Sequence, residues 1–224
     1  MPAPPAARTR PALCLALALL AGAARAQGPE GHAALVQNAD GRDHVVLDGT
    51  WKAIVDPLDV GYRNIFDEPT PERWFARDAR PAERWDRVEY SFDDDGALRV
   101  PGDWNSQRPE LFFYEGSVWY RRQFRASRAP DGRLVVRFGA ANARARVFLN
   151  GELVGEHEGG YTPFDVEVTD RVPAAPPGPL RLGAVGGTEH TLVVQVNNTR
   201  RRAAVPTDTR TGGTTAASRA RSGS

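Results

Sequence analysis

The sequence lacks the residues on which metal and redox chemistry depend. It has one cysteine, Cys14, and four scattered histidines among 224 residues. One cysteine cannot close an internal disulfide, and the histidines show no zinc-ligand spacing. Lysine is also nearly absent, since Lys52 is the only one, and arginines bring the formal net charge to just +1. We therefore expect no cofactor, and nothing in the charge predicts nucleic acid as a partner.

The first 26 residues have the pattern of a secretory signal peptide. Arg8 and Arg10 precede the apolar run "LCLALALLAGAA", and "ARA" stands before Gln27 as a cleavage-type ending. The run is too short to span a membrane, although an ordinary apolar helix is an alternative interpretation. We expect removal of residues 1–26, which include Cys14, and a periplasmic or secreted protein that has no membrane partner afterwards.

Helical periodicity is scarce, and alternation typical of strands replaces it. In "RLVVRFG", Leu134, Val136 and Phe138 share one face, and Val135 and Arg137 share the other. The runs "YTPFDVEVT" and "HTLVVQVNN" alternate in the same way, with a Pro/Gly-rich loop between them. Many short strands with frequent turns predict an all-β sandwich.

One hairpin is predicted from two residues. In "ARVFLNGELVGE", Asn150 and Gly151 join two apolar runs. Both central positions of a tight hairpin turn need a positive φ, which Asn and Gly tolerate. A turn between two paired strands is expected here.

Two segments do not fit the strand pattern. Residues 27–44 are polar and are interpreted as a loose lead-in segment. Residues 63–95 are long, charged and rich in proline, with Trp74 and Trp85 spaced along them. We interpret this segment as an extended insertion with a helical turn, held to the sandwich by its two tryptophans.

Three strings carry a resemblance to a known family. They are "LRVPGDWNSQRPELFFYEGSVWYRRQF", "VFLNGELVGEHEGGYTPFDVEVT" and "TLVVQVNNTRRRAAVPT". Together they resemble the amino-terminal sugar-binding domain of glycoside hydrolase family 2, which includes β-glucuronidases and β-galactosidases. The resemblance covers 45–207 in the family's order and implies a jelly-roll β-sandwich of the galactose-binding-domain type.

The same resemblance implies partners for this domain. In the family, it packs against an immunoglobulin-like domain and a (β/α)₈ barrel, and the barrel holds two catalytic glutamates that act on a terminal β-linked sugar. Such carboxyls lie ~5–5.5 Å apart, and a barrel needs ~250 residues with alternating strands and helices. This chain shows no such alternation, so we expect no catalytic residue on it.

Asp103 and Trp104 are the candidate substrate-binding residues. The resemblance implies that Asp103 lies on a loop reaching the mouth of the barrel, where it helps to hold the sugar in the first subsite. A carboxylate accepts strong hydrogen bonds from two adjacent hydroxyls. Trp104 is expected either to brace this loop or to offer the sugar a flat apolar surface. From the residues alone, Asp103 is also a plausible turn residue after Pro101-Gly102.

Other polar residues are interpreted as structural. We expect solvated surface groups at four acids: Glu110, Glu115, Glu156 and Glu158. The "DDD" at 93–95 fits a turn better than a calcium site, which needs six to eight oxygen ligands. Asn197, Asn198 and the pair Gly159-Gly160 match family motifs, but we assign them to a strand exit, a turn and a close backbone approach.

The carboxyl-terminal segment lacks every large apolar residue. From Pro206 to Ser224 there is no Leu, Ile, Val, Phe, Trp, Tyr or Met. In the family, "VPT" is followed by a string like "D-W-W-N-Y-G-G-L-T-R-E-V-R-L". When the codons of 211–224 are read with a shift of one base, each of the fourteen shifted codons can encode the corresponding residue of that string. We therefore hypothesise a frameshift after Thr207 and a disordered, out-of-frame tail over 208–224. A natural Ser/Thr/Gly-rich linker is the alternative.

Three functional interpretations remain open on sequence. The favoured one is the amino-terminal carbohydrate-binding domain of a secreted β-glycosidase, inactive without its barrel. A second is a stand-alone carbohydrate-binding module. A third is a split enzyme whose barrel is supplied by another chain.

Overall fold

The computed structural model describes residues 35–38, 41–62, 74–77, 90–174 and 187–199, together with the main chain of 213–214 and 219–223. All of these belong to one compact unit, 33–224. The signal peptide predicted over 1–26 and the side chains of Trp74 and Trp85 lie outside the described residues. Among the described helices, none has the length and hydropathy needed to cross a membrane.

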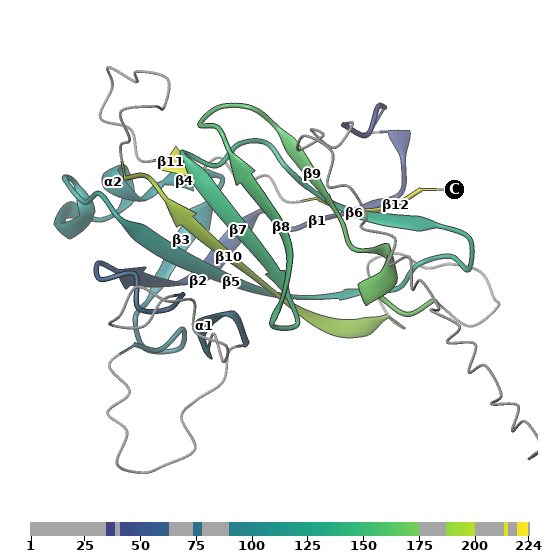
Figure 1. The fold of residues 1–224 in the computed structure, drawn as a ribbon, viewed down its shortest axis with the longest axis horizontal. Helices are drawn as coiled ribbons and strands as arrows, with labels where there is room; N and C mark the ends of the chain where they lie inside the picture. Colours follow the sequence, from purple (N-terminus) through teal and green to yellow (C-terminus); the bar gives the residue numbers. More distant parts are fainter. Residues whose placement is uncertain are drawn as a thin grey trace, which may run out of the picture. The chain divides into compact units, whose positions relative to one another are not determined.

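Antiparallel strands form two main sheets, which confirms the all-β sandwich (Figure 1). The six-stranded sheet has the order β3-β2-β5-β10-β7-β8 and the four-stranded sheet the order β1-β12-β6-β9, while β4 and β11 form a small pair. The strands are β1 (His44–Val46), β2 (Gly49–Asp56), β3 (Ala97–Val100), β4 (Gly102–Asp103), β5 (Ser117–Ala126), β6 (Arg133–Phe138), β7 (Arg144–Leu149), β8 (Glu152–Glu158), β9 (Phe164–Glu167), β10 (Thr188–Asn197), β11 (Gly213–Thr214) and β12 (Arg219–Gly223). The helices are α1 (Trp74–Arg77) and α2 (Trp104–Gln107), with 3-10 turns η2 (Pro109–Leu111) and η3 (Thr169–Arg171).

The main hydrophobic core combines residues of both sheets. On β6, Leu134, Val136 and Phe138 are fully buried, as their alternation predicts. From the six-stranded sheet, Val118 and Tyr120 of β5 join the same cluster. Successive side chains of a strand point to opposite faces, so this core occupies one face of each sheet.

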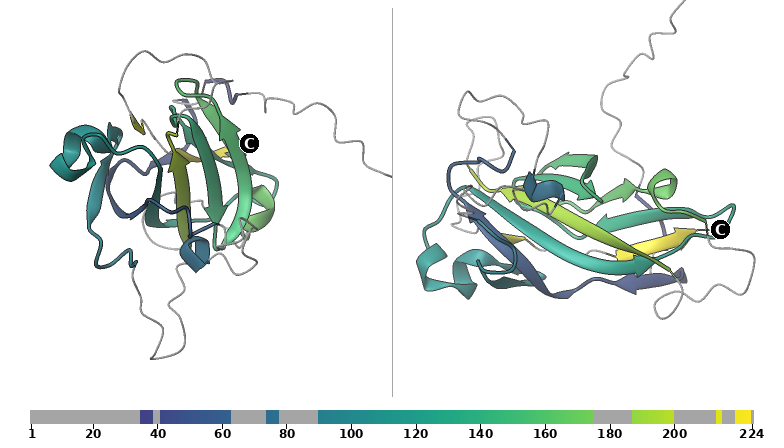
Figure 2. Two further views of the ribbon diagram at one scale, coloured as in Figure 1. Left: turned by 60° about the vertical axis from the view of Figure 1, so that its left-hand side comes forward. Right: turned by 90° about the horizontal axis from the view of Figure 1, so that it is seen from below.

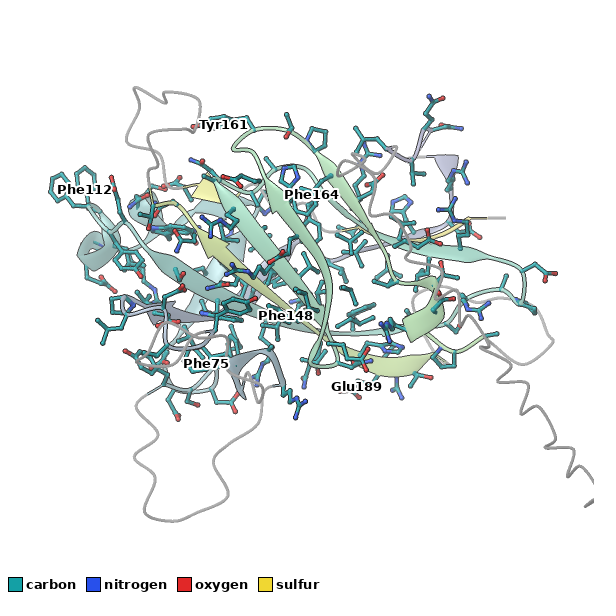
Figure 3. All side chains as sticks on the ribbon, viewed as in Figure 1. Phe75, Phe112, Phe148, Tyr161, Phe164 and Glu189 are labelled. Atoms are coloured by element: carbon teal, nitrogen blue, oxygen red, sulfur yellow. The ribbon has the colours of Figure 1, made fainter. Side chains whose placement is uncertain are left out.

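The opposite face of the six-stranded sheet carries a second cluster under α1. Trp119 of β5 stacks on Phe148 of β7 at 5.7 Å between ring centroids. Phe75 of α1 packs its edge against Trp119 at 5.5 Å and is fully buried (Figure 3). The expected helical turn in the insertion is therefore present, and Phe75, which the sequence did not single out, is its anchor. Figure 2 shows α1 and the sheets from two further sides.

The predicted hairpin joins β7 to β8. Asn150 and Gly151 have φ values of 51° and 83°, as a tight turn of this kind requires. The Asn150 side chain also binds the neighbouring strand, because its Oδ1 accepts from the Thr191 amide at 3.0 Å. This contact ties the turn to β10.

The lead-in segment is less loose than the sequence suggests. The Val36 amide donates to Asp165 Oδ2 of β9, and Arg137 Nη1 of β6 donates to the Val36 carbonyl at 2.7 Å. These two polar side chains hold the main chain at Val36, in the described part of the segment. Local hydrophobicity does not predict such contacts.

Two short strands lie within 208–224, where the sequence predicts a disordered tail. The β12 strand pairs with β6 on one side, with Ala220 opposite Val136, and with β1 on the other, with Arg221 opposite His44. Sheet pairing uses main-chain groups that every residue except proline carries. A segment without large apolar residues can therefore still complete a sheet.

His190 of β10 gives the fold a defined response to acid. Its ring is 2% exposed, and its Nδ1 accepts from Asn150 Nδ2 at 3.0 Å. Burial lowers the pKa of His190 below its ordinary value of 6.5. Between the two pKa values, the unfolded chain protonates this histidine and the folded chain keeps it neutral. The folded state is therefore destabilised as the pH falls from about 6.5 through the lowered pKa.

We predict that His190→Gln, which keeps an acceptor for Asn150, flattens the fall in melting temperature between about pH 7 and pH 5. Thermal unfolding followed by circular dichroism measures this slope. The matched control His44→Gln, on β1, should leave the slope unchanged. An equal slope in His190→Gln and the parent would show that His190 does not account for the acid response.

Candidate functional site

Asp103 lies where β4 ends and α2 begins, and its carboxylate is fixed by the helix that it caps. Its main chain is extended, with φ −97° and ψ 144°, as is usual for an N-cap residue. Oδ1 accepts from the Ser106 amide and Oδ2 from the Ser106 hydroxyl, each at 2.7 Å. A carboxylate has about four acceptor positions, so a half-buried Asp103 keeps capacity for further donors.

Trp104 anchors this loop in the hydrophobic core. It is fully buried and belongs to the main core. Its Nε1 donates to the Tyr114 carbonyl at 3.4 Å, which joins the two ends of the segment between Asp103 and Tyr114. Of the two roles expected for Trp104, the bracing role fits its burial, since it has no exposed face to offer a sugar.

Asn105 closes the loop, and the sequence analysis did not identify it. Its Nδ2 donates to three carbonyls, those of Leu111 at 2.6 Å, Phe112 at 3.2 Å and Tyr114 at 3.2 Å. One short side chain thereby holds the turn η2 against α2. No pattern in the string "WNSQ" signals this contact, because its acceptors are main-chain atoms that any residue supplies.

Gln107 ties the same loop to the edge strand β3. Its Oε1 accepts from the Arg99 amide at 2.6 Å, and its Nε2 donates to the Arg99 carbonyl at 3.0 Å. The same Nε2 lies 3.0 Å from the Asp103 carbonyl. The side-chain amide of Gln107 thus pairs with the main chain of β3 as a neighbouring strand would. Its contact with the Asp103 carbonyl ties Asp103 to that strand.

Asn198, at the exit of β10, clamps the other end of the loop. Its Oδ1 accepts from the Gly116 amide at 2.8 Å, and the Asn198 amide donates to the Gly116 carbonyl at 3.2 Å. Its neighbour Asn197 donates from Nδ2 to the Ser117 hydroxyl at 2.9 Å. The structural roles expected for Asn197 and Asn198 match these contacts.

The glycines of the loop between β8 and β9 have the expected structural features. Gly159 has a φ of 143°, a conformation that side chains rarely adopt. A Cβ on Gly160 would lie 2.8 Å from Asn142 Oδ1, so the main chain approaches Asn142 closely.

The other acids that the sequence singles out lie on the surface or in a turn. Four glutamates are exposed, as expected: Glu110, Glu115, Glu156 and Glu158. The acids at 93–95 form a turn, in which the Asp94 and Asp95 amides donate to the Ser91 carbonyl and Asp93 pairs with Arg121 at 2.7 Å. The described part of the chain contains no group of acids, histidines or cysteines able to hold a metal ion.

A buried polar cluster lies on the outer face of the six-stranded sheet, and sequence reasoning missed it. Asp56 is fully buried and accepts from Val60 N at 2.9 Å, Gly61 N at 3.0 Å and Trp119 Nε1 at 2.9 Å. Burial raises the pKa of Asp56, although these donors oppose the shift. Three protein donors bind this carboxylate and no part of Asp56 is exposed, so we assign the cluster to anchoring the turn after β2 and not to binding a ligand.

Two substitutions at Asp103 separate its capping role from its charge. Loss of an N-cap costs about 0.5–2 kcal/mol, so we predict that Asp103→Ala lowers the free energy of unfolding by this amount. Asp103→Ser keeps a capping oxygen and should stay within about 0.5 kcal/mol of the parent. Urea unfolding measures both. An equal loss in the two variants would contradict the capping role.

Comparison with known proteins points to one family. The description "Glycosyl hydrolases family 2, sugar binding domain" matches residues 47–176. The β-glucuronidase of Pongo abelii is 30% identical over 191 residues, which cover 82% of this chain and 26% of the relative. A β-galactosidase of Thermoanaerobacter pseudethanolicus is 29% identical over 70% of this chain and 17% of its own length.

Solved structures agree with this assignment. A β-glucuronidase from an uncultured Clostridium species matches with a TM-score of 0.56 and 26% identity, over 84% of this chain and 30% of that one. The Lactobacillus rhamnosus β-glucuronidase matches with a TM-score of 0.53 and 26% identity, over 74% and 23%. The chain thus spans about a quarter of the length of the relatives it matches. With the jelly-roll sandwich and the matched span, the chain belongs to the sugar-binding domain of glycosyl hydrolase family 2.

Proposed function

We propose that this chain is the amino-terminal carbohydrate-binding domain of a β-glycosidase of the β-glucuronidase or β-galactosidase type, inactive without a catalytic barrel. The observation that carries this proposal is the match of its relatives, which are whole glycosidases of which the chain spans about a quarter. The Asp103 loop supports it, because it presents a fixed carboxylate at the end of the sandwich.

The role of this domain is to position the sugar. Ser106 and the braces at Trp104 and Asn105 fix the orientation of Asp103 before any ligand arrives. A carboxylate fixed in this way accepts hydrogen bonds from adjacent hydroxyls with little further loss of entropy. Bond cleavage in this mechanism belongs to two glutamates of the barrel, one as acid/base and one as nucleophile.

We also propose that the protein is exported to the periplasm or secreted, on the evidence of the signal-peptide pattern in residues 1–26. Its partners are then the immunoglobulin-like and barrel domains of the parental enzyme and a terminal β-linked sugar.

The frameshift after Thr207 is part of the same proposal. A strand in the position of β12 is needed to connect β1 to β6, yet residues 206–224 offer that strand no apolar residue larger than alanine. We predict that sequencing the gene from the Val205 codon onward reveals the motif "D-W-W-N-Y-G-G" in the shifted frame, followed by a barrel-coding region. A stop codon with no barrel sequence downstream would contradict this and favour the stand-alone binding module.

The function itself is tested by activity. We expect the purified chain to hydrolyse neither 4-nitrophenyl β-glucuronide nor 4-nitrophenyl β-galactoside, and the frame-restored full-length protein to hydrolyse one of them. In the restored protein, Asp103→Ser should lower kcat/KM about 10-fold or more, because it keeps the cap and removes charge-assisted hydrogen bonds. Asp103→Glu should recover part of the loss. Full activity of Asp103→Ser would refute the positioning role.

A further inference from the structure

Two phenylalanines on the Asp103 loop are exposed side by side. Phe112 and Phe113 expose 55% and 76% of their surfaces. Their rings lie 4.6 Å apart between centroids and meet at 88°, edge against face. Figure 3 shows Phe112 at the end of the molecule, directed away from both sheets. We call Phe112 and Phe113 together the phenylalanine pair.

The phenylalanine pair is held outward by a rigid frame. The Phe112 amide donates to the Pro109 carbonyl at 3.2 Å, and Asn105 Nδ2 donates to the Phe112 carbonyl at 3.2 Å. On either side, Leu111 is buried in the main core and the Tyr114 amide donates to the Leu111 carbonyl at 3.0 Å. The exposure therefore belongs to an ordered main chain, and a surface fixed beforehand loses little entropy when it binds.

The surroundings of the phenylalanine pair indicate what it binds. Glu110 and Glu115 flank it in the sequence, and both are exposed. Exposed aromatic rings offer a large apolar surface, and carboxylates on the same loop supply hydrogen-bond acceptors. A pyranose ring matches this arrangement, since it has an apolar C–H face and a rim of hydroxyl donors. The exposed carboxylate of Glu110 repels an anionic sugar, so the expected ligand is neutral.

We propose that the phenylalanine pair is a binding subsite for a neutral sugar ring, separate from the one at Asp103. This inference rests on the proposed function, because the pair would bind the ring on the leaving-group side of the same carbohydrate ligand. One loop then carries two elements of recognition: Asp103 binds hydroxyls of one ring, and one phenylalanine of the pair stacks on the next ring while the other contacts its edge. Specificity for a neutral neighbour follows from Glu110.

The first experiment measures binding by the full chain. Saturation-transfer NMR and calorimetry with lactose and cellobiose should detect weak binding. The acidic disaccharide Glc-β-1,4-GlcA, whose charged ring is the one assigned to the phenylalanine pair, should bind more weakly than cellobiose. The double variant Phe112→Ala/Phe113→Ala should bind cellobiose about 10-fold or more weakly, the loss of about one stacked ring. Phe113→Trp should keep or improve binding.

A matched control uses another exposed aromatic residue. Tyr161 is 59% exposed and lies on the loop between β8 and β9, away from Phe112 (Figure 3). Tyr161→Ala should leave cellobiose binding unchanged. Because the pair is exposed, its double variant should melt within a few degrees of the parent, so weaker binding cannot be attributed to unfolding.

Three outcomes would overturn the inference. They are no cellobiose binding by the folded parent, undiminished binding by the double variant, or tighter binding of the acidic disaccharide. If the double variant keeps sugar binding but loses association with the separately produced downstream domains, the pair is an interdomain contact and the subsite is rejected. None of these outcomes bears on the proposed function, which is tested by kcat/KM of the Asp103→Ser variant of the frame-restored enzyme.

Discussion

The antiparallel pairing of β5 with β10 is the constraint on which the rest of the structure depends. Ten residues of each strand pair, from Ser117 opposite Asn197 to Ala126 opposite Thr188. Both strands also pair on their other edges, β5 with β2 and β10 with β7, so they form the centre of the six-stranded sheet. A central strand buried on both faces can take large side chains in both directions. Trp119 and Tyr120, adjacent in the sequence, therefore serve two different clusters.

The candidate site is built at one end of this strand pair. Gly116 precedes β5 and Asn198 follows β10, and two hydrogen bonds between Asn198 and Gly116 join the two ends. From that clamp, the chain between Asp103 and Tyr114 is closed by amide side chains that bind main-chain carbonyls. Such bonds leave no apolar requirement on the outer surface of the loop. The loop can therefore expose a carboxylate and two phenylalanines without losing its shape.

The four-stranded sheet has a different kind of stability. Its strand β6 contributes fully buried residues to the core, but β1 joins it only through β12 among the described strands. The β12 strand supplies main-chain pairing on both sides, to β6 and to β1. The four-stranded sheet therefore depends on side-chain packing at β6 and on main-chain pairing at β12.

Elements with local signals are predictable from the amino-acid sequence. The alternation of Leu134, Val136 and Phe138 predicts β6, and Asn150-Gly151 predicts the hairpin between β7 and β8, because strand period and turn geometry act over a few residues. The family resemblance also placed Asp103 on a loop. The burial of Trp104 was one of two alternatives that the sequence left open.

Contacts between segments that are distant in the sequence follow from the assembled fold. Asp56 accepts from Trp119, 63 residues away. Phe75 packs on Trp119, and Trp119 stacks on Phe148, only because β10 brings β5 and β7 into one sheet. Asn105 binds carbonyls, which leave no trace in the sequence, and β12 pairs through main-chain atoms alone. Hydrogen bonds to the main chain and packing across a sheet depend on which distant segments come together in the fold. The residue types in a short stretch of sequence do not specify these partners, so the contacts can be identified only once the strands are assembled.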